Sequence, residues 1–349
     1  MPIIKSPALS KIDRKDSKIL RILDMDARIP MKQLAKKVGI SRQVAEYRVE
    51  RMAREGTIGG FFTVFDSAVV GKRWFRIVLQ MRRITSAEKQ AFIDFFKAHP
   101  DVLWLGEVGG NWDFVINFVT DDQFSFEGLF NGVLKEWGGS IQRYEVLVYI
   151  NVRDQQRRYL LEDYESEPRS LVHRMEFDRD LKLDALDKKI IRLISKDAAL
   201  PYSKIASSLD VSYKTVQSRM KAMEQSGLIL GYRAIANPGK TGYESYMLFL
   251  GTNAYDAALE RQLNEFLKHP NVTYVVRQLG RWRIGIEAEF RDRNEFQAFL
   301  VELRTRFGEM ISEYEAFPIF FDHKIDYFPE GALSETEEEI GKKDEKREK

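Results

Sequence analysis

The first half of the chain is repeated in the second half, and this repeat limits the architecture more than any other feature. Early in the copies the offset is 171 residues, matching Lys11, Asp13, Asp16, Lys18 and Ile19 with Lys182, Asp184, Asp187, Lys189 and Ile190. Later the offset is 170, matching His99, Pro100, Gly110, Trp112 and Tyr144 with His269, Pro270, Gly280, Trp282 and Tyr314. Solenoid units run about 20 to 50 residues. The period therefore indicates duplication of a whole two-domain module.

Composition narrows the class of protein. With 349 residues, 44% hydrophobic and 31% charged, the chain is long enough for two to four ordinary domains. No stretch approaches the roughly 18 apolar residues of a membrane span, and residues 1–10 lack the apolar core of a signal peptide. We therefore expect a cytoplasmic protein without a membrane partner. The absence of cysteine excludes disulfides, thiolate metal sites and cysteine nucleophiles.

Positive charge is concentrated in the same segment of both copies. Residues 11–56 hold 13 Lys and Arg against 7 Asp and Glu, and residues 182–227 hold 9 against 5. The whole chain carries only +2, so the remainder is acidic. Confined positive potential is typical of a nucleic-acid contact, because neutralising phosphates releases counterions. Two lysine-rich helix faces exposed to solvent would give the same excess of positive charge without binding nucleic acid.

Each basic segment has the pattern of three short helices. In the first copy the apolar spacing predicts a helix over 16–23, a second opened by Pro30 and stopped by Gly39, and a third capped by Ser41. Pro201 and Ser212 play the same parts in the second copy. Such a unit is free to place its third helix in a DNA major groove. We expect Arg48 and Arg219, the one charge kept in both third helices, to pair with a first-helix carboxylate.

The outward residues of the third helices are the candidate base readers. In the first copy they are Arg42, Gln43, Glu46 and Tyr47, and in the second copy Tyr213, Lys214, Gln217 and Ser218. Arg can bind guanine with two hydrogen bonds and Gln can bind adenine in the same way. Around them, the candidate backbone contacts are the capping serines Ser41 and Ser212 and the cations Lys36, Lys37, Arg51 and Lys204. Glu46 fits least well, because a carboxylate in a groove must find a cytosine amino group or turn away.

The ordered set of residues over Lys11–Phe61 resembles the leucine-responsive regulator and AsnC (Lrp/AsnC) family of prokaryotic transcription factors. The shared pattern is Ile-Asp-x-x-Asp-x-x-Ile-Leu, Leu-Ala-x-x-Val-Gly-Ile-Ser and Glu-Gly-x-Ile-x-Gly. Lys182–Tyr232 is similar, and the resemblance extends over 11–153 and 182–321. It implies a regulator that binds double-stranded DNA.

After each basic segment the pattern changes to strand, helix, strand, strand, helix, strand. In the first copy the strands are expected over 74–81, 102–108, 112–119 and 141–150, and the helices over 86–98 and 123–137; in the second copy the strands are expected over 243–250, 272–279, 282–290 and 311–320. This order predicts a ferredoxin-like βαββαβ domain. The fold class is α+β, a tandem duplication of a winged helix-turn-helix domain followed by that sheet domain. In the family that the chain resembles, the sheet domain binds amino-acid effectors and forms the dimer.

The central hairpin of the first sheet domain, Gly110, Asn111, Trp112 and Asp113, is the candidate effector contact. In the family the pattern is a glycine, two residues and an aspartate, and a fixed carboxylate could hold an ammonium group. The second copy departs from the pattern with Gly280, Arg281, Trp282 and Arg283. Ordinary hairpin chemistry explains the same residues, with glycine for positive φ and tryptophan packing across strands.

Catalysis has little support in the sequence. The four histidines, His99, His173, His269 and His323, show no metal-ligand spacing or nucleophile signature, so we expect no catalytic residue, metal or cofactor. Two alternatives to a DNA-binding regulator remain. Siroheme decarboxylases resemble the same module, but their His-Asn-Tyr and Tyr-Asn-x-Trp-Phe segments correspond here to 103–107 and 110–114, which lack those histidines. The other alternative is a structural scaffold that has lost DNA binding.

The sequence therefore divides into six segments. They are a helix-turn-helix at 11–60, a sheet domain at 61–153, a linker at 154–181, a second helix-turn-helix at 182–231, a second sheet domain at 232–322 and a polar, charged tail at 323–349. The linker has a helical pattern around 157–165. Because it keeps the two sheet domains at high local concentration, we expect them to pair as an internal pseudo-dimer, from which a higher homo-oligomer could assemble.

Overall fold

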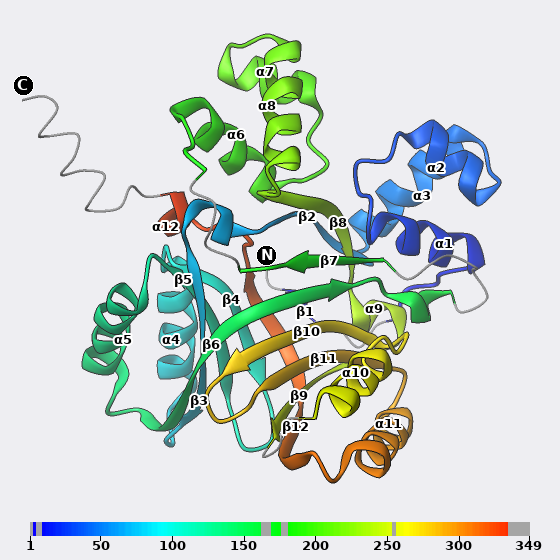
Figure 1. The fold of residues 1–349 in the computed structure, drawn as a ribbon. Coiled ribbons are helices and arrows are strands. Elements are labelled where there is room, and N and C mark those ends of the chain that lie inside the picture. The colour runs from blue at the N-terminus through cyan, green and yellow to red at the C-terminus, as the bar shows by residue number, and fades with distance from the viewer. Residues whose placement is uncertain (1–2, 5–8, 162–168, 176–180, 253–255, 334–349) are drawn as a thin grey trace, which may run out of the picture.

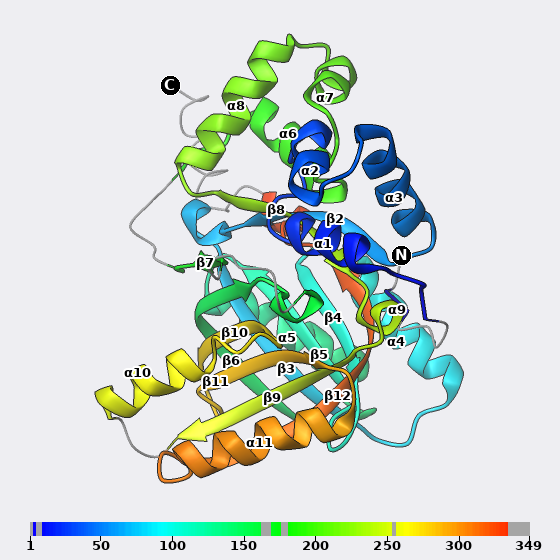
Figure 2. The same cartoon turned by 90° about the vertical axis from the view of Figure 1, so that its right-hand side faces the viewer.

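Two helical units lie together on one end of a β-barrel, and further helices cover the outside of the barrel (Figures 1 and 2). The computed structural model describes residues 3–4, 9–161, 169–175, 181–252 and 256–333. The predicted α+β class and the two-copy architecture are confirmed.

The helical units contain the predicted helices. The first comprises α1 (Arg14–Leu23), α2 (Met31–Val38) and α3 (Arg42–Arg54), and the second α6 (Ala185–Lys196), α7 (Tyr202–Leu209) and α8 (Tyr213–Gln225). Asp13 and Asp184 form capping boxes that start α1 and α6. The Ser41 and Ser212 hydroxyls accept hydrogen bonds from Val44 N–H (3.3 Å) and Thr215 N–H (3.0 Å), so both predicted caps are confirmed.

An arginine fixes each third helix to its first helix, as predicted. Arg48 lies 2.8 Å from both Asp13 and Asp16, and Arg219 lies 2.6 Å from Asp184 and 3.2 Å from Asp187. The hydrogen bond to Asp16 raises the pKa of Arg48, and the hydrogen bond to Asp184 raises that of Arg219. Both arginines therefore position the third helix, and neither points outward as a base reader.

The two helical units exchange contacts through a pair of wing strands, β2 (Ile58–Phe65) and β8 (Ile229–Ala236), which pair antiparallel with each other. Ala27 N–H donates to the carbonyl of Tyr232 (2.8 Å), and Ala198 N–H donates to the carbonyl of Phe61 (3.1 Å). The two bonds are equivalent, because Ala198 and Tyr232 lie 171 residues after Ala27 and Phe61. Each unit donates one of these bonds to the other. The units are thus related as in a symmetric dimer, within one chain.

The sheets of the two copies join into one closed barrel. The first copy gives β3 (Arg73–Met81), β4 (Val102–Val108), β5 (Phe114–Thr120) and β6 (Ile141–Gln155), and the second β9 (Glu244–Thr252), β10 (Val272–Leu279), β11 (Ile284–Phe290) and β12 (Ile311–Ile325). Each copy has the antiparallel strand order of the ferredoxin-like arrangement, and β6–β10 and β12–β4 pairings connect them. Closure leaves none of these eight strands with a fully free edge.

The helices of each sheet domain cover the outer face of its sheet. These helices are α4 (Ser86–Ala98), α5 (Gln123–Trp137), α10 (Ala257–Phe266) and α11 (Arg293–Phe307). Short elements complete the described chain: β1 (Ile3–Ile4), η1 (Ser67–Val70), η2 (Arg158–Leu160), β7 (Ser170–His173), α9 (Pro238–Thr241) and α12 (Glu330–Leu333). Inside the barrel, Trp112 and Trp282 pack edge to face at 5.8 Å among apolar side chains at the end distant from the helical units.

Several expected boundaries differ from the structure. The helix-turn-helix limits at 60 and 231 fall inside β2 and β8, and β6 and β12 run past the expected strand ends at 150 and 320 because each pairs with the other copy. The linker is partly ordered, since β7 pairs with β6 and η2 covers Arg158–Leu160. Of the helical pattern expected around 157–165, the structure has the short η2, while residues 162–165 and the tail beyond 333 lie outside the described residues.

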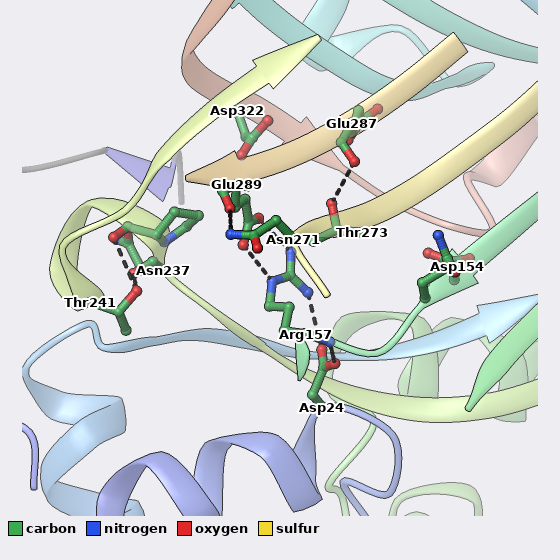
Figure 3. A network of polar contacts seen from close by, with 12 residues as sticks. Asp24, Asp154, Arg157, Asn237, Thr241, Asn271, Thr273, Glu287, Glu289 and Asp322 are labelled. Atoms are coloured by element: carbon green, nitrogen blue, oxygen red, sulfur yellow. Dashed lines mark hydrogen bonds and ion pairs between the residues drawn. The ribbon is translucent and has the colours of Figure 1, made fainter. Parts of the chain in front are cut away.

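A buried ionic network joins the first helical unit to the barrel (Figure 3). Asp24, the fully buried C-cap of α1, lies 3.0 Å from Arg157 and 2.7 Å from Arg233. Arg157 also lies 3.0 Å from Glu289 on β11, and Arg233 on β8 lies 3.0 Å from Asp154 on β6. A buried charge without a partner costs several kcal/mol. Four separate segments are therefore held in one arrangement.

Replacing Asp16 by alanine should destabilise the protein more than the equivalent change at Asp187. Asp16 is 1% exposed and holds both Arg48 and Arg51, so its loss leaves two cations without their buried partner, at a cost of about 3 kcal/mol. Asp187 pairs with Arg219, which is 40% exposed, so about 1 kcal/mol is expected. Urea unfolding followed by circular dichroism measures the free energy of unfolding of both variants. Equal losses would contradict the larger role of Asp16.

Acid should weaken the ionic network through Asp154. Burial raises the pKa of this carboxyl, but the hydrogen bond from His173 and the charge of Arg233 outweigh burial and lower it overall. A lowered pKa contributes stability that is full above the ordinary value of about 3.9 and is lost as pH falls through the folded value. The difference in unfolding free energy between wild type and Asp154→Asn should accordingly shrink below about pH 4. A difference that stays constant from pH 7 to pH 3 would refute this role.

Candidate nucleic-acid interface

The expected readers of the first copy lie on the free face of α3. Ser41, Arg42, Gln43 and Tyr47 are exposed, and Tyr47 is 60% exposed despite its large ring. Arg42 Nε donates to Glu46 at 2.7 Å, one turn away. Glu46 thus has a partner on its own helix, and it orients Arg42 without itself needing a base.

The second copy presents a different surface at the same place. Tyr213, Lys214, Gln217 and Ser218 are exposed on α8, and none repeats the aligned residue of α3. The Tyr213 ring packs edge to face on Tyr202 of α7 at 5.7 Å. Tyr213 is therefore partly held in place before any partner binds.

The expected backbone contacts divide into two groups. Lys36, Lys37 and Lys204 are exposed, and nothing in their position opposes contact with a phosphate. Arg51 differs, because its guanidinium lies 2.7 Å from buried Asp16 and its side chain is 22% exposed. We therefore assign Arg51 to the support of α3, alongside Arg48, rather than to the outer surface.

Arg28 joins the two helical units, a role that could not be predicted from the sequence. Its guanidinium donates to the carbonyls of Ala198 (2.7 Å) and Leu200 (3.0 Å) in the other unit and lies 4.5 Å over the Tyr202 ring. In the sequence it is an ordinary turn arginine two residues before Pro30. Only the pairing of the two copies brings its partners near.

The candidate effector hairpin is engaged in structural contacts. Gly110 has φ of +75°, the Trp112 ring is buried with its indole N–H donating to Glu315 (2.5 Å), and Asp113 accepts from Met81 N–H (2.7 Å). Asn111 is exposed. In the second copy Arg281 lies 2.9 Å from Glu313. These contacts favour ordinary hairpin chemistry over ammonium binding.

Two of the histidines act at helix ends. His99 and His269 accept hydrogen bonds through Nδ1 from Asp101 N–H and Asn271 N–H, each at 3.2 Å. Burial lowers the pKa of both imidazoles. Among the residues that the structure describes, no group of acidic, His or Cys side chains converges as a metal site, and no helix is long and apolar enough to cross a membrane.

Known proteins resemble the chain both in the helical units and across the whole fold. Residues 12–53 match the AsnC-type helix-turn-helix domain, and 183–229 match a winged helix-turn-helix DNA-binding domain. The crystal structure of the siroheme decarboxylase NirDL has a TM-score of 0.59 with 16% identity, covering 92% of this chain and 96% of that one. At this identity the likeness concerns the fold alone.

Curated relatives extend the match beyond the helical units. An uncharacterized HTH-type transcriptional regulator of Pyrococcus horikoshii is 30% identical over 124 residues, which are 36% of this chain and 78% of the relative. LrpA of the same organism is 44% identical over 61 residues, 18% of this chain and 43% of LrpA. Regulatory protein AsnC of Haemophilus influenzae is 42% identical over 62 residues, 18% of this chain and 41% of AsnC. The chain belongs to the Lrp/AsnC family of transcriptional regulators.

Proposed function

We propose that the chain binds double-stranded DNA in a sequence-specific manner through both helix-turn-helix units and regulates transcription. The observation that carries the proposal is the pair of exposed third-helix faces, fixed relative to each other by the β2–β8 pairing and by Arg28. The N-terminal residues of such helices contact base edges, while flanking cations contact the backbone. The +6 and +4 charge of the two units supplies the attraction.

An enzymatic role has less support. The siroheme decarboxylase NirDL has been solved with an iron-uroporphyrin III analogue, a polycarboxylate. Here the cavity in the barrel has a volume of about 110 Å³ and is lined by five carboxylates and two guanidiniums, so it is too small and too acidic for a ligand of that kind. His173 and His323, the histidines outside the helix ends, bond to Asp154 and Glu107.

We also propose that the chain responds to a small effector. The resemblance implies an amino acid at Gly110–Asp113, where the carboxylate already accepts a backbone hydrogen bond and the tryptophan is buried. Contacts at that hairpin therefore leave the interior of the barrel as the better place for a ligand.

Arg42 and Lys37 should differ in how they affect DNA binding. If Arg42 reads a base, Arg42→Ala loses roughly 1 to 3 kcal/mol on the preferred site and less on unrelated DNA. Lys37→Ala should weaken all DNA alike and lower the slope of log affinity against log salt by about one. Fluorescence anisotropy over a range of salt, on a site recovered from genomic binding, measures both.

A matched control for these two variants is Arg51→Ala, since Arg51 faces Asp16 and not the outer surface. It should lower stability and leave the salt slope unchanged. If Arg42→Ala weakens preferred and unrelated DNA equally, Arg42 contacts the backbone. If no DNA binds with a salt-dependent affinity, the chain is a scaffold and the proposal fails.

A single chain should recognise an asymmetric operator. The two reader faces differ at every aligned position, yet they belong to units that one chain holds side by side, so the two half-sites cannot be identical. We expect the half-sites to lie about one helical turn apart, roughly 34 Å. Footprinting combined with light scattering at low micromolar concentration tests this.

The expected result is one chain bound to two unlike half-sites. A palindrome should appear only where two chains assemble on the DNA. A single chain protecting a perfect inverted repeat would contradict the unequal reading of the two helices.

A further inference from the structure

A cavity of about 110 Å³ lies inside the barrel at the end that faces the helical units. Both copies contribute to its wall: Trp104 comes from β4, Tyr274 from β10 and Asp322 from β12, while Arg233 on β8 closes it from the wing. A cavity of about 150 Å³ holds a benzene ring, so this smaller one suits a ligand of about four or five heavy atoms. It is separate from the hairpin end, where Trp112 and Trp282 fill the barrel.

The wall of the cavity carries more negative than positive charge. Its carboxylates are Asp154, Glu287, Glu289, Asp322 and Asp326, and its cations are Arg157 and Arg233. Both cations are engaged with Asp24 and with Glu289 or Asp154. Asp322 accepts a hydrogen bond from the indole N–H of Trp104 (3.0 Å), and Glu287 lies 4.0 Å from Arg76. Burial raises the pKa of Asp326.

Polar and aromatic side chains complete the wall. Ser245 on β9 is 7% exposed and lines the cavity. Trp74, Trp104, Tyr274 and Tyr327 add aromatic surfaces, which attract cations.

Three acidic residues of the wall lie in the second copy and have no acidic counterpart in the first. Glu287, Glu289 and Asp322 correspond to Asn117, Val119 and Val152 of the first copy at the offset of 170. On the other side of the network, Arg233 and Arg157 correspond to Phe62 and Tyr327, whose rings pack edge to face at 6.4 Å. The repeat itself therefore does not require these charges, and they form a single asymmetric site where a homodimer would carry two equal ones.

We propose that this cavity binds a small organic cation, an ammonium or guanidinium group on a short aliphatic chain. Asp322, Glu287 and the Ser245 hydroxyl would hold the cationic group, and the aromatic side chains would contact the aliphatic part. A metal ion fits less well, because no acidic side chains of the described chain converge closely enough to bind one. Figure 3 shows Glu287 and Glu289 on one strand, β11, and Arg157 between Glu289 and Asp24; Asp322 lies on β12, with β9 between the two strands.

The same geometry gives the ligand a route to the DNA-binding face. A cation near Glu289 competes with Arg157, and Arg157 holds Asp24 at the end of α1. Occupation of the cavity should therefore alter the position or mobility of the first helical unit. This regulatory step depends on the proposed DNA binding, whereas ligand binding does not.

Calorimetry on the full chain with propylammonium and methylguanidinium tests the binding, with propionate, which is of similar size, and iron-uroporphyrin as anionic comparators. We expect the cations to bind and the anions not to bind. Asp322→Asn should weaken cation binding about tenfold, since a charged hydrogen bond is lost. Ser245→Leu should abolish binding by filling the cavity with the charges unchanged.

Two controls keep the test decisive. Asp94→Asn removes a 60% exposed carboxylate on α4 and should leave affinity unchanged, and thermal unfolding shows whether each variant is folded. Cations that bind no better than propionate, or binding that folded Asp322→Asn and Ser245→Leu retain, would overturn the proposal. Binding lost in Asp113→Asn but kept in Asp322→Asn would place the ligand at the hairpin instead and would overturn it as well.

DNA affinity with and without a saturating cation, measured on the same operator, separates this inference from the proposed function. A change that Asp322→Asn removes supports the coupling through Arg157. If the protein binds the cation but no DNA, the cation site stands and the proposed regulation of DNA binding fails. If it binds DNA but no cation, the proposed function stands and the cation site fails.

Discussion

Closure of the barrel is the constraint on which the rest of the structure depends. Each copy contributes a four-stranded sheet whose outer strands, β6 and β12 among them, are completed only by the other copy through the β6–β10 and β12–β4 pairings. Unpaired strand edges invite association with other chains. Because both partners lie on one chain, that association is intramolecular, and the wing strands and helical units follow the same pairing.

Pairing within one chain also frees the two halves to diverge. In a homodimer, a substitution at one position appears twice across the axis, so a buried charge must be satisfied in both places. Here Asp24, Arg157 and Glu289 form an ion network while the equivalent positions Ser195, Tyr327 and Val119 do not. The reader faces of α3 and α8 diverge in the same manner. Asymmetry in the site and in the reading surface thus has one origin.

The local parts of this architecture could be predicted from the sequence, because each depends on residues close together in the chain. The caps at Ser41 and Ser212, the helix end at Gly39 and the histidine turns follow from short spacings, and the pairing of Arg48 with Asp16, 32 residues away, stays within one helical unit. The position of Arg28 and the charge network could not be predicted, since their partners are at least 79 residues away. Strand ends were also misjudged, where β6 and β12 extend to pair with the other copy.

Positions that match between the copies and positions that differ have different roles inside the barrel. The matched glycines and tryptophans draw attention to Gly110 and Gly280, yet their conservation between the copies reflects a shared structural task, with Trp112 and Trp282 packing against each other inside the barrel. The residues that give the cavity its charge are those that differ between the copies. In a fused pseudo-dimer, matched positions maintain the fold that both copies share. Buried polar positions that differ between the copies are free to form a specific binding site.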